Sequence, residues 1–193
     1  MQRLHLMITA ALAVAVVVLG VLLWRQGRSG DDPSAHAAAT LTPDDESAVR
    51  AVVAEFANTW NRHDMKAMHE LNTEDVEWVN VTANHWKGNP SVLKGHSTIH
   101  RTVFAKTDMS VEKTSVRAIA PNAVIAVAAM KFGPVTIPSG QVLPELRTRG
   151  SFIMVRRGAA WKITHFQNTT IDADAEKNDP ITWDETGFMP GRK

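Results

Sequence analysis

The sequence has no cysteine and no tyrosine among its 193 residues. Without cysteine, the chain cannot form disulfides, use a thiolate nucleophile or hold cysteine-bound zinc or an iron–sulfur cluster. The absence does not identify the compartment, because a disulfide-free domain can work on either side of a membrane. Without tyrosine, no phenolic hydroxyl is available as a hydrogen-bond donor in a site.

The chain also lacks an excess of charge of either sign. Lys and Arg total 21 and Asp and Glu total 20, so the net charge is +1. A nucleic-acid surface needs a concentrated basic face, so we expect no nucleic-acid partner. No G-x-G-x-x-G turn or other cofactor motif is visible, and we expect no cofactor.

What the sequence does have is one long uncharged run, residues 6–24. Nineteen residues are close to the length of about 20 that a membrane-spanning helix needs. Two interpretations remain open. The length favours an uncleaved anchor, whereas a signal peptide would be cleaved near Ala37, leaving a secreted protein. Both place the domain outside the cytoplasm, although Arg25 and Arg28 after the run favour the inverted orientation.

Residues 25–41 are small, polar and alanine-rich, and we interpret them as a linker. Thr42 and Pro43 then predict the start of a helix with an apolar stripe, and Asp64 predicts the start of a second, short helix. A third helix is predicted over residues 90–106, with Asn89 as its cap. Gly95 in its interior is unfavourable.

The second half is rich in β-branched and aromatic residues. We predict strands over residues 75–81, 110–119, 122–132, 145–157 and 160–171. Residues 133–144 read as a loop, residues 157–160 as a hairpin turn and residues 174–193 as an irregular tail. Helices followed by a strand meander indicate an α+β domain, which we place at residues 42–173.

Four stretches carry a family resemblance: FANTWNRHDMKAM, TEDVEWVNV, HWKGNPSVLKGHSTIHRTVF and FIMVRRGAAWKITHFQNT. In this order they resemble the SnoaL-like branch of the nuclear transport factor 2-like superfamily, and within it the SgcJ/EcaC-type proteins labelled oxidoreductases. The resemblance implies a cone-shaped, curved antiparallel sheet with about three helices (a cystatin-like fold) that encloses one pocket. It also implies a homodimer formed through the sheet. The membrane segment at residues 6–24 is an addition to the family pattern.

His96 and His100 fall on the apolar face of the third predicted helix, because residues four apart are neighbours there. Because the ordinary pKa of histidine lies near neutral pH, either residue is a candidate general acid or base. The alternative is a core histidine hydrogen-bonded to its neighbours. The spacing also suits a metal, but Ser97 stands where H-E-x-x-H has Glu and no third ligand is evident, so we expect none.

Five further residues are candidates for ligand binding: Trp78, Asn80, Trp86, Phe104 and Asn168. Asn80 shares one face of its strand with Trp78, and Asn168 faces away from Gln167. Strict alternation puts Lys162, Thr164 and Phe166 on the same face as Asn168. The alternatives are tryptophans that belong to the core and an Asn80 that faces solvent.

These observations predict a membrane-tethered pocket protein for a small, largely apolar ligand, with histidine-assisted catalysis. Related ketosteroid isomerases use an Asp base with a Tyr/Asp oxyanion hole. That mechanism is disfavoured because the chain has no tyrosine. The alternative is a non-catalytic dimeric module that serves in assembly at the membrane.

Overall fold

The computed structural model describes residues 40–137 and 139–178. The predicted anchor at residues 6–24, the cleavage site near Ala37 and most of the linker lie outside these residues. Within the described ranges, no helix is long and apolar enough to cross a membrane.

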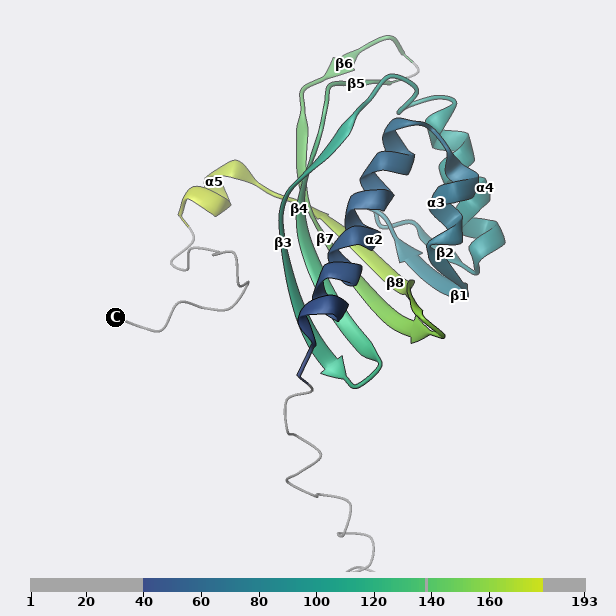
Figure 1. Ribbon diagram of the computed structural model, residues 1–193. Coiled ribbons are helices and arrows are strands. Elements are labelled where there is room, and N and C mark those ends of the chain that lie inside the picture. The colour runs from purple at the N-terminus through teal and green to yellow at the C-terminus, as the bar shows by residue number, and fades with distance from the viewer. Residues whose placement is uncertain (1–39, 138, 179–193) are drawn as a thin grey trace, which may run out of the picture. The chain divides into compact units, whose positions relative to one another are not determined.

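A curved sheet of six strands forms the frame of the domain (Figure 1). Its spatial order is β2-β1-β8-β7-β4-β3. All five predicted strands are present, and β2 and a small β5–β6 hairpin inside residues 133–144 are additions. The strands are β1 (Asn72–Val79), β2 (His85–Lys87), β3 (Met109–Ala120), β4 (Ala123–Phe132), β5 (Val135–Thr136), β6 (Val142–Leu143), β7 (Leu146–Arg157) and β8 (Ala160–Thr170).

The prediction of an antiparallel sheet was wrong at one pair, because β1 runs parallel to β8. Parallel neighbours need a long crossover, and the chain between β1 and β8 supplies one. The pairing sets Trp78 beside Phe166, and their rings stack with centroids 4.1 Å apart. The sheet is therefore mixed, and Trp78, a candidate ligand-binding residue, becomes the neighbour of Phe166 from the last strand.

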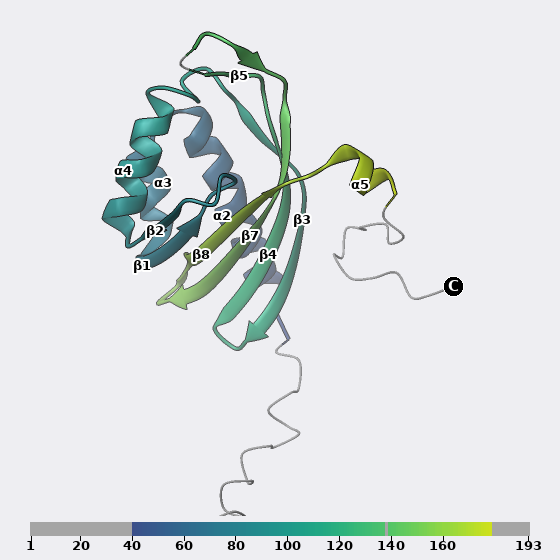
Figure 2. The same ribbon diagram turned by 180° about the vertical axis from the view of Figure 1, so that it is seen from behind.

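Four helices occur in the described residues, rather than about three: α2 (Pro43–Asn61), α3 (Met65–Glu70), α4 (Asn89–His100) and α5 (Ala173–Lys177). Figures 1 and 2 show α2, α3 and α4 on one side of the sheet and α5 on the other. Two predicted caps are confirmed. Thr42 Oγ1 accepts from Asp45 N at 3.1 Å, and Asp64 Oδ1 accepts from Ala67 N at 3.0 Å.

Two helix predictions need correction. The third helix ends at His100, and turns replace its predicted last six residues. The tail is not wholly irregular either, because Asp172 accepts from Ala175 N and caps α5. Arg147 holds α5 to the sheet through bonds to Glu112 and Glu176.

Asn89 does not cap α4 as predicted. Gly88 occupies the cap position with a φ of 77°, a conformation that favours glycine, and offers no side chain. The Asn89 side chain is thereby free to bond elsewhere, and it turns back towards α3.

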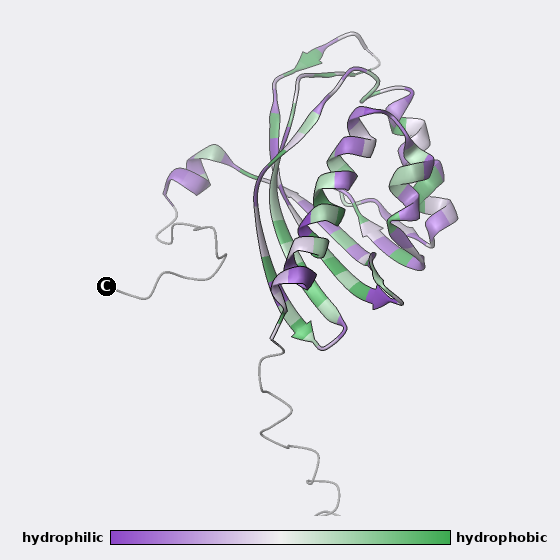
Figure 3. Ribbon diagram, in the orientation of Figure 1, coloured by the Kyte–Doolittle hydropathy of each residue, from purple (hydrophilic) through white to green (hydrophobic). Residues whose placement is uncertain are grey.

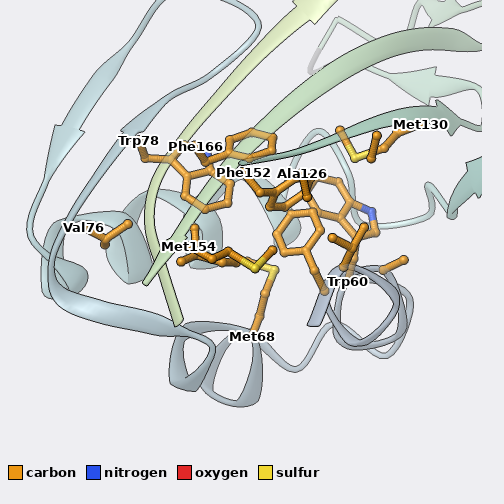
Figure 4. Packing of buried hydrophobic residues seen from close by; sticks show 14 of the residues in the cluster. Trp60, Met68, Val76, Trp78, Ala126, Met130, Phe152, Met154 and Phe166 are labelled. Carbon is orange, nitrogen blue, oxygen red and sulfur yellow. The ribbon is translucent and has the colours of Figure 1, made fainter. Parts of the chain in front are cut away.

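The core lies between the sheet and the three helices on its concave side (Figure 4). Phe56 of α2 contacts Phe152 and Phe166 of the sheet, with centroids 5.5 and 6.0 Å apart. Figure 3 shows hydrophobic and hydrophilic residues alternating along the long strands. Replacing Phe152, which is fully buried, with alanine would cost about 3–5 kcal/mol.

A bulge in β8 changes which of its residues face the core. The β7–β8 register shifts between Ile153 and Met154, so Trp161 and Ile163 are buried as well as Phe166. Strict alternation was therefore wrong for Lys162 and Thr164, because a bulge inserts one residue into the pleat. Beyond the bulge, alternation holds and Asn168 shares the inward face of Phe166.

Candidate ligand-binding and active site

A cavity of about 280 Å³ lies between the concave face of the sheet and the helices. Six of the seven candidate residues line it: His96, Asn80, Trp78, Trp86, Phe104 and Asn168. The rest of the wall is mostly apolar, with Phe56 and Trp60 from α2, Met130 and Phe132 from β4, Leu146 from β7 and Phe166 from β8. An apolar enclosure with a few polar groups is typical of a small-molecule site.

His96 is the titratable side chain of the cavity wall. It projects from α4 between two indoles and is 3% exposed. Its ring lies edge-on to Trp78 and Trp86, with centroids 4.8 and 5.4 Å away. His96 Nδ1 lies 3.1 Å from Nε2 of His69, so Nε2 is the nitrogen left to face a ligand.

His69, which sequence reasoning missed, supports His96 from outside the cavity. It lies on α3, four residues after Met65 and on the same buried side. That spacing was a signal we could have read, because both residues fall on one helix face. Asn89 and Asn72 bond to its Nδ1 side, at 3.0 and 2.9 Å.

Two sets of proton positions fit these contacts, because a neutral imidazole nitrogen either donates or accepts. In the first, His69 Nδ1–H donates to Asn89 Oδ1, and His69 Nε2 accepts from His96 Nδ1–H. In the second, Asn72 Nδ2 donates to His69 Nδ1, and His69 Nε2–H donates to His96 Nδ1. The first set leaves a lone pair on His96 Nε2, which can then act as a base.

Burial keeps both imidazoles neutral. Desolvation, with smaller effects from His69 and His100, holds the pKa of His96 well below its ordinary value, against an opposing hydrogen bond to the Val92 backbone. Desolvation also lowers the pKa of His69 to about 4, against the opposing bond to Asn89. At neutral pH both imidazoles are therefore uncharged, and each has one nitrogen with a lone pair.

His100 is not among the residues that line the cavity with His96. One turn further along α4, it packs edge-on against Trp60, with centroids 4.2 Å apart. Its Nδ1 lies 2.8 Å from Nδ1 of His63, and burial lowers its pKa to about 4. This position fits the alternative interpretation, a core histidine hydrogen-bonded to a neighbour.

Trp86 forms one wall of the cavity because α4 carries glycine opposite it. A Cβ at Gly95 would lie 2.7 Å from the indole, which is too close. The residue that was unfavourable for the helix therefore lets the indole lie against the helix backbone. Thr82 and Asn84 from the turn before Trp86 are exposed and also border the cavity.

The two candidate asparagines differ in what their side chains do. Asn80 Oδ1 accepts from Thr82 N, Thr82 Oγ1 and Asn84 N, so it holds the turn between β1 and β2. Asn168 Oδ1 is buried and has no hydrogen-bond partner among residues 40–137 and 139–178. Of the two, Asn168 is the amide that the scaffold leaves available for a ligand.

Phe104 reaches the cavity from the turns that follow α4, and its ring lies 5.1 Å from Trp60. Over the described part of the chain, no group of three or more histidine, aspartate or glutamate side chains could hold a metal ion. The site is thus a cavity with mostly aromatic walls, one imidazole from His96, and one amide, that of Asn168, whose oxygen has no hydrogen-bond partner in the described residues.

The sequence matches the family model of the SnoaL-like domain over residues 49–170. This span is more than half of the chain. The chain belongs to the SnoaL-like domain family. No curated protein matches it.

Solved structures of similar fold support this assignment. An uncharacterised cystatin-like protein from Caulobacter vibrioides is 27% identical with a TM-score of 0.66, and the match covers 70% of this chain and 95% of that one. A ketosteroid isomerase-like protein from Erwinia carotovora atroseptica is 14% identical, with a TM-score of 0.58 and coverage of 68% and 99%. A hexachlorocyclohexane dehydrochlorinase is 11% identical, with a TM-score of 0.60 and coverage of 66% and 85%. The last two show likeness of fold alone.

Proposed function

We propose that this SnoaL-like domain is an enzyme that removes or transfers a proton on a small, largely apolar ligand. His96 Nε2 acts as the general base, the aromatic walls bind the body of the ligand and the Asn168 amide contacts a polar group on it. The observation that carries the proposal is the place of His96, an imidazole in a mostly apolar cavity wall with its Nδ1 3.1 Å from His69 Nε2. When that Nδ1 carries the proton, Nε2 has a lone pair for the ligand.

The size and polarity of the cavity limit the ligand. A volume of about 280 Å³ is just below the usual range for small-molecule pockets, about 300–1,000 Å³, so the ligand must be small. Neighbouring folds include proteins named for isomerase and dehydrochlorinase activity, and both reactions begin at a hydrogen bonded to carbon. The fold permits such chemistry, and isomerisation or elimination is the class we favour over the oxidoreductase label of SgcJ/EcaC-type proteins.

Ligand capture tests the proposal directly. We would incubate the full-length chain with a mixed small-molecule extract, remove unbound material and identify retained compounds by native mass spectrometry. His96→Gln, which keeps a polar side chain, is compared with wild type, and His85→Gln serves as the matched control outside the cavity. A compound retained by wild type and the control but lost by His96→Gln supports the site. Failure of the folded wild-type protein to retain any compound would argue against it.

A second candidate function is a dimeric assembly module, and the outward face of the sheet favours it. Ile125 of β4 pairs with Ile153 of β7, and Val127 follows on the same face. These three side chains are only partly buried in the single chain. β4 therefore carries apolar residues on its outward face as well as on its core face. Burying such a row is favourable, so we propose a homodimer formed through this face.

The dimer is testable independently of the pocket. Val127→Lys on the outward face should give a monomer in sedimentation equilibrium, whereas Lys113→Ala on the exposed strand β3 should leave the mass unchanged. If wild type is a monomer at all concentrations, the assembly module loses its support. A dimer that retains no small molecule would favour this function over the enzyme.

Tethering to a membrane by residues 6–24, with the domain outside the cytoplasm, is also part of the proposal. Its support is the length of the uncharged run in the sequence. Cell fractionation combined with protease accessibility of the intact chain distinguishes an anchored form from a secreted form cleaved near Ala37. Recovery of the chain in the cytoplasmic fraction would contradict both.

A further inference from the structure

His69 and His96 together connect the cavity to a second surface of the protein. His96 lines the cavity, whereas His69 borders a polar groove that residues of α3 and β1 help to line. His96 Nδ1 and His69 Nε2 are 3.1 Å apart, so the pair links a lining residue of the cavity to a lining residue of the groove. The ring centroids are 5.1 Å apart and the planes are tilted by 37°.

The groove on the His69 side differs in chemistry from the cavity. Charged side chains of both signs border it: Lys66, Glu70, Glu74, Asp75, Arg157 and Lys162. His69 and His96 are equally little exposed, at 3% each, but their surroundings differ. The His69 ring borders the polar groove and contacts the Asn89 oxygen, whereas the His96 ring lies between two indoles. A positive charge costs less beside a hydrogen-bond acceptor than in an apolar wall.

We propose that His69 is a proton-relay residue that takes the charge generated at His96 out of the cavity. The ligand's proton moves to His96 Nε2, and the electron pair of the broken bond stays on the ligand. The Nδ1 proton of His96 moves at the same time to His69 Nε2. His96 is again neutral and His69 carries the positive charge, with its Nδ1–H still bonded to Asn89 Oδ1.

The relay also runs in reverse, which suits a reaction that returns the proton to another atom of the ligand. His96 Nε2 then protonates the product, and His96 Nδ1 recovers its proton from His69 Nε2. No external acid is consumed, and both histidines return to the starting tautomer. Asn89 is a positioning residue in this scheme, because it fixes His69 without touching the ligand.

The inference rests on the proposed role of His96 as a base, but it is tested without any ligand. We would label histidine with ¹⁵N in the full-length chain and assign ring tautomers by NMR at neutral pH. The expected state is Nδ1–H on both His96 and His69. Finding His96 protonated on Nε2 at rest would overturn the relay, whatever the ligand-capture experiment shows.

Exchange of the His96 ring proton with water supplies the second measurement. His69→Gln keeps an oxygen that accepts from His96 Nδ1–H but cannot carry a proton onward. We expect exchange to slow by about tenfold or more, because a positioned proton acceptor contributes at least that much. His85→Gln, the matched control, should leave the rate unchanged. An equal rate in wild type and His69→Gln would show that His69 is only structural.

A second variant covers the case in which His69→Gln does not fold. Asn89→Asp places a carboxylate on the His69 Nδ1–H at the start of α4, where an acidic residue suits the helix dipole. The carboxylate should raise the pKa of His69 by about one unit or more and speed exchange at His96. An unchanged His69 titration would contradict the Asn89 link and with it the relay.

Discussion

The domain contains two histidine pairs, one turn of α4 apart, and they have opposite surroundings. His96 pairs with His69 between a cavity and a polar groove, whereas His100 pairs with His63 behind the Trp60 ring. The two α4 members of these pairs, His96 and His100, are the same residue type and lie four positions apart on one helix. Only the first pair has a ring that lines the cavity.

The difference teaches that the indole next to each histidine decides its role. Trp60 is 4% exposed and is fixed by a bond from Nε1 to the Thr107 carbonyl, so it seals His100 in the core. Trp86 is partly exposed and stands at the side of the cavity, so His96 keeps access to it. His96 and His100 both have lowered pKa values, and this property alone would not separate them.

The largest effect should come from acid, because each pair contains one histidine whose pKa is lowered to about 4, His69 and His100. The pKa of His69 and that of His100 are each lowered to about 4, whereas the unfolded chain binds protons near 6.5. The unfolded state therefore binds more protons between these values, and the free energy of unfolding falls as pH drops from 6.5 to 4. Each residue should contribute about 3 kcal/mol, at about 1.4 kcal/mol per pKa unit.

Urea denaturation at pH 7 and at pH 4.5 measures this loss. His69→Gln and His100→Gln should each flatten the pH dependence by a similar amount. A loss that is the same in wild type and both variants would mean that neither histidine is neutral in the folded protein.

The next effect separates the pairs. His96→Gln should weaken catalysis by about 100-fold or more, since a positioned base contributes about 10²–10⁴. His100→Gln should change the rate little, although it affects stability. Steady-state kinetics on a compound recovered by ligand capture measures both. Equal losses of rate in the two variants would remove the distinction between the pairs.

A smaller effect tests the two asparagines beside the cavity. Asn80→Ala removes an acceptor used by three donors and should lower the free energy of unfolding by about 1–2 kcal/mol. Asn168→Ala should leave stability unchanged and weaken ligand binding. Thermal melts and titration of the same ligand measure the two outcomes, and the opposite pattern would exchange their roles.

The smallest effect concerns the wall beside His96. Gly95→Ala gains about 1 kcal/mol of helix propensity but places a Cβ 2.7 Å from the Trp86 ring. The two terms roughly cancel in stability, so the visible result should be a displaced indole, seen as a change in tryptophan fluorescence, and weaker binding. Trp86→Leu in the same chain should remove the effect. An unchanged spectrum would show that Trp86 does not need this glycine.

Local patterns predicted much of this domain. Thr42 and Asp64 were read as caps because short polar side chains satisfy free amides at helix starts. The composition of β-branched and aromatic residues predicts the four long strands from residue 109 onward to within one position at each end. β1 begins three residues earlier than predicted. Asn168 was assigned to the inner face from alternation, which works beyond the bulge and fails before it at Lys162 and Thr164.

The partners of the site were not readable in the same way. His69 and His96 lie 27 positions apart, and Asn89 bonds to His69 because Gly88 has taken the cap position. The parallel pairing of β1 with β8, which stacks Trp78 on Phe166, also joins distant parts of the chain. Such contacts depend on how whole helices and strands pack against one another, and the hydrophobic periodicity of the sequence does not encode that packing.

By itself, the sequence determined the fold class, the order of the elements and the set of side chains that could form a pocket. These follow from local preferences for helix, strand and burial, which act over a few residues. The tertiary structure alone decided that His96 faces the cavity and His100 the core. His96 and His100 lie on the same face of α4, so helical spacing does not distinguish them. The side chains packed against that face, Trp86 beside His96 and Trp60 beside His100, place one histidine at the cavity and the other in the core.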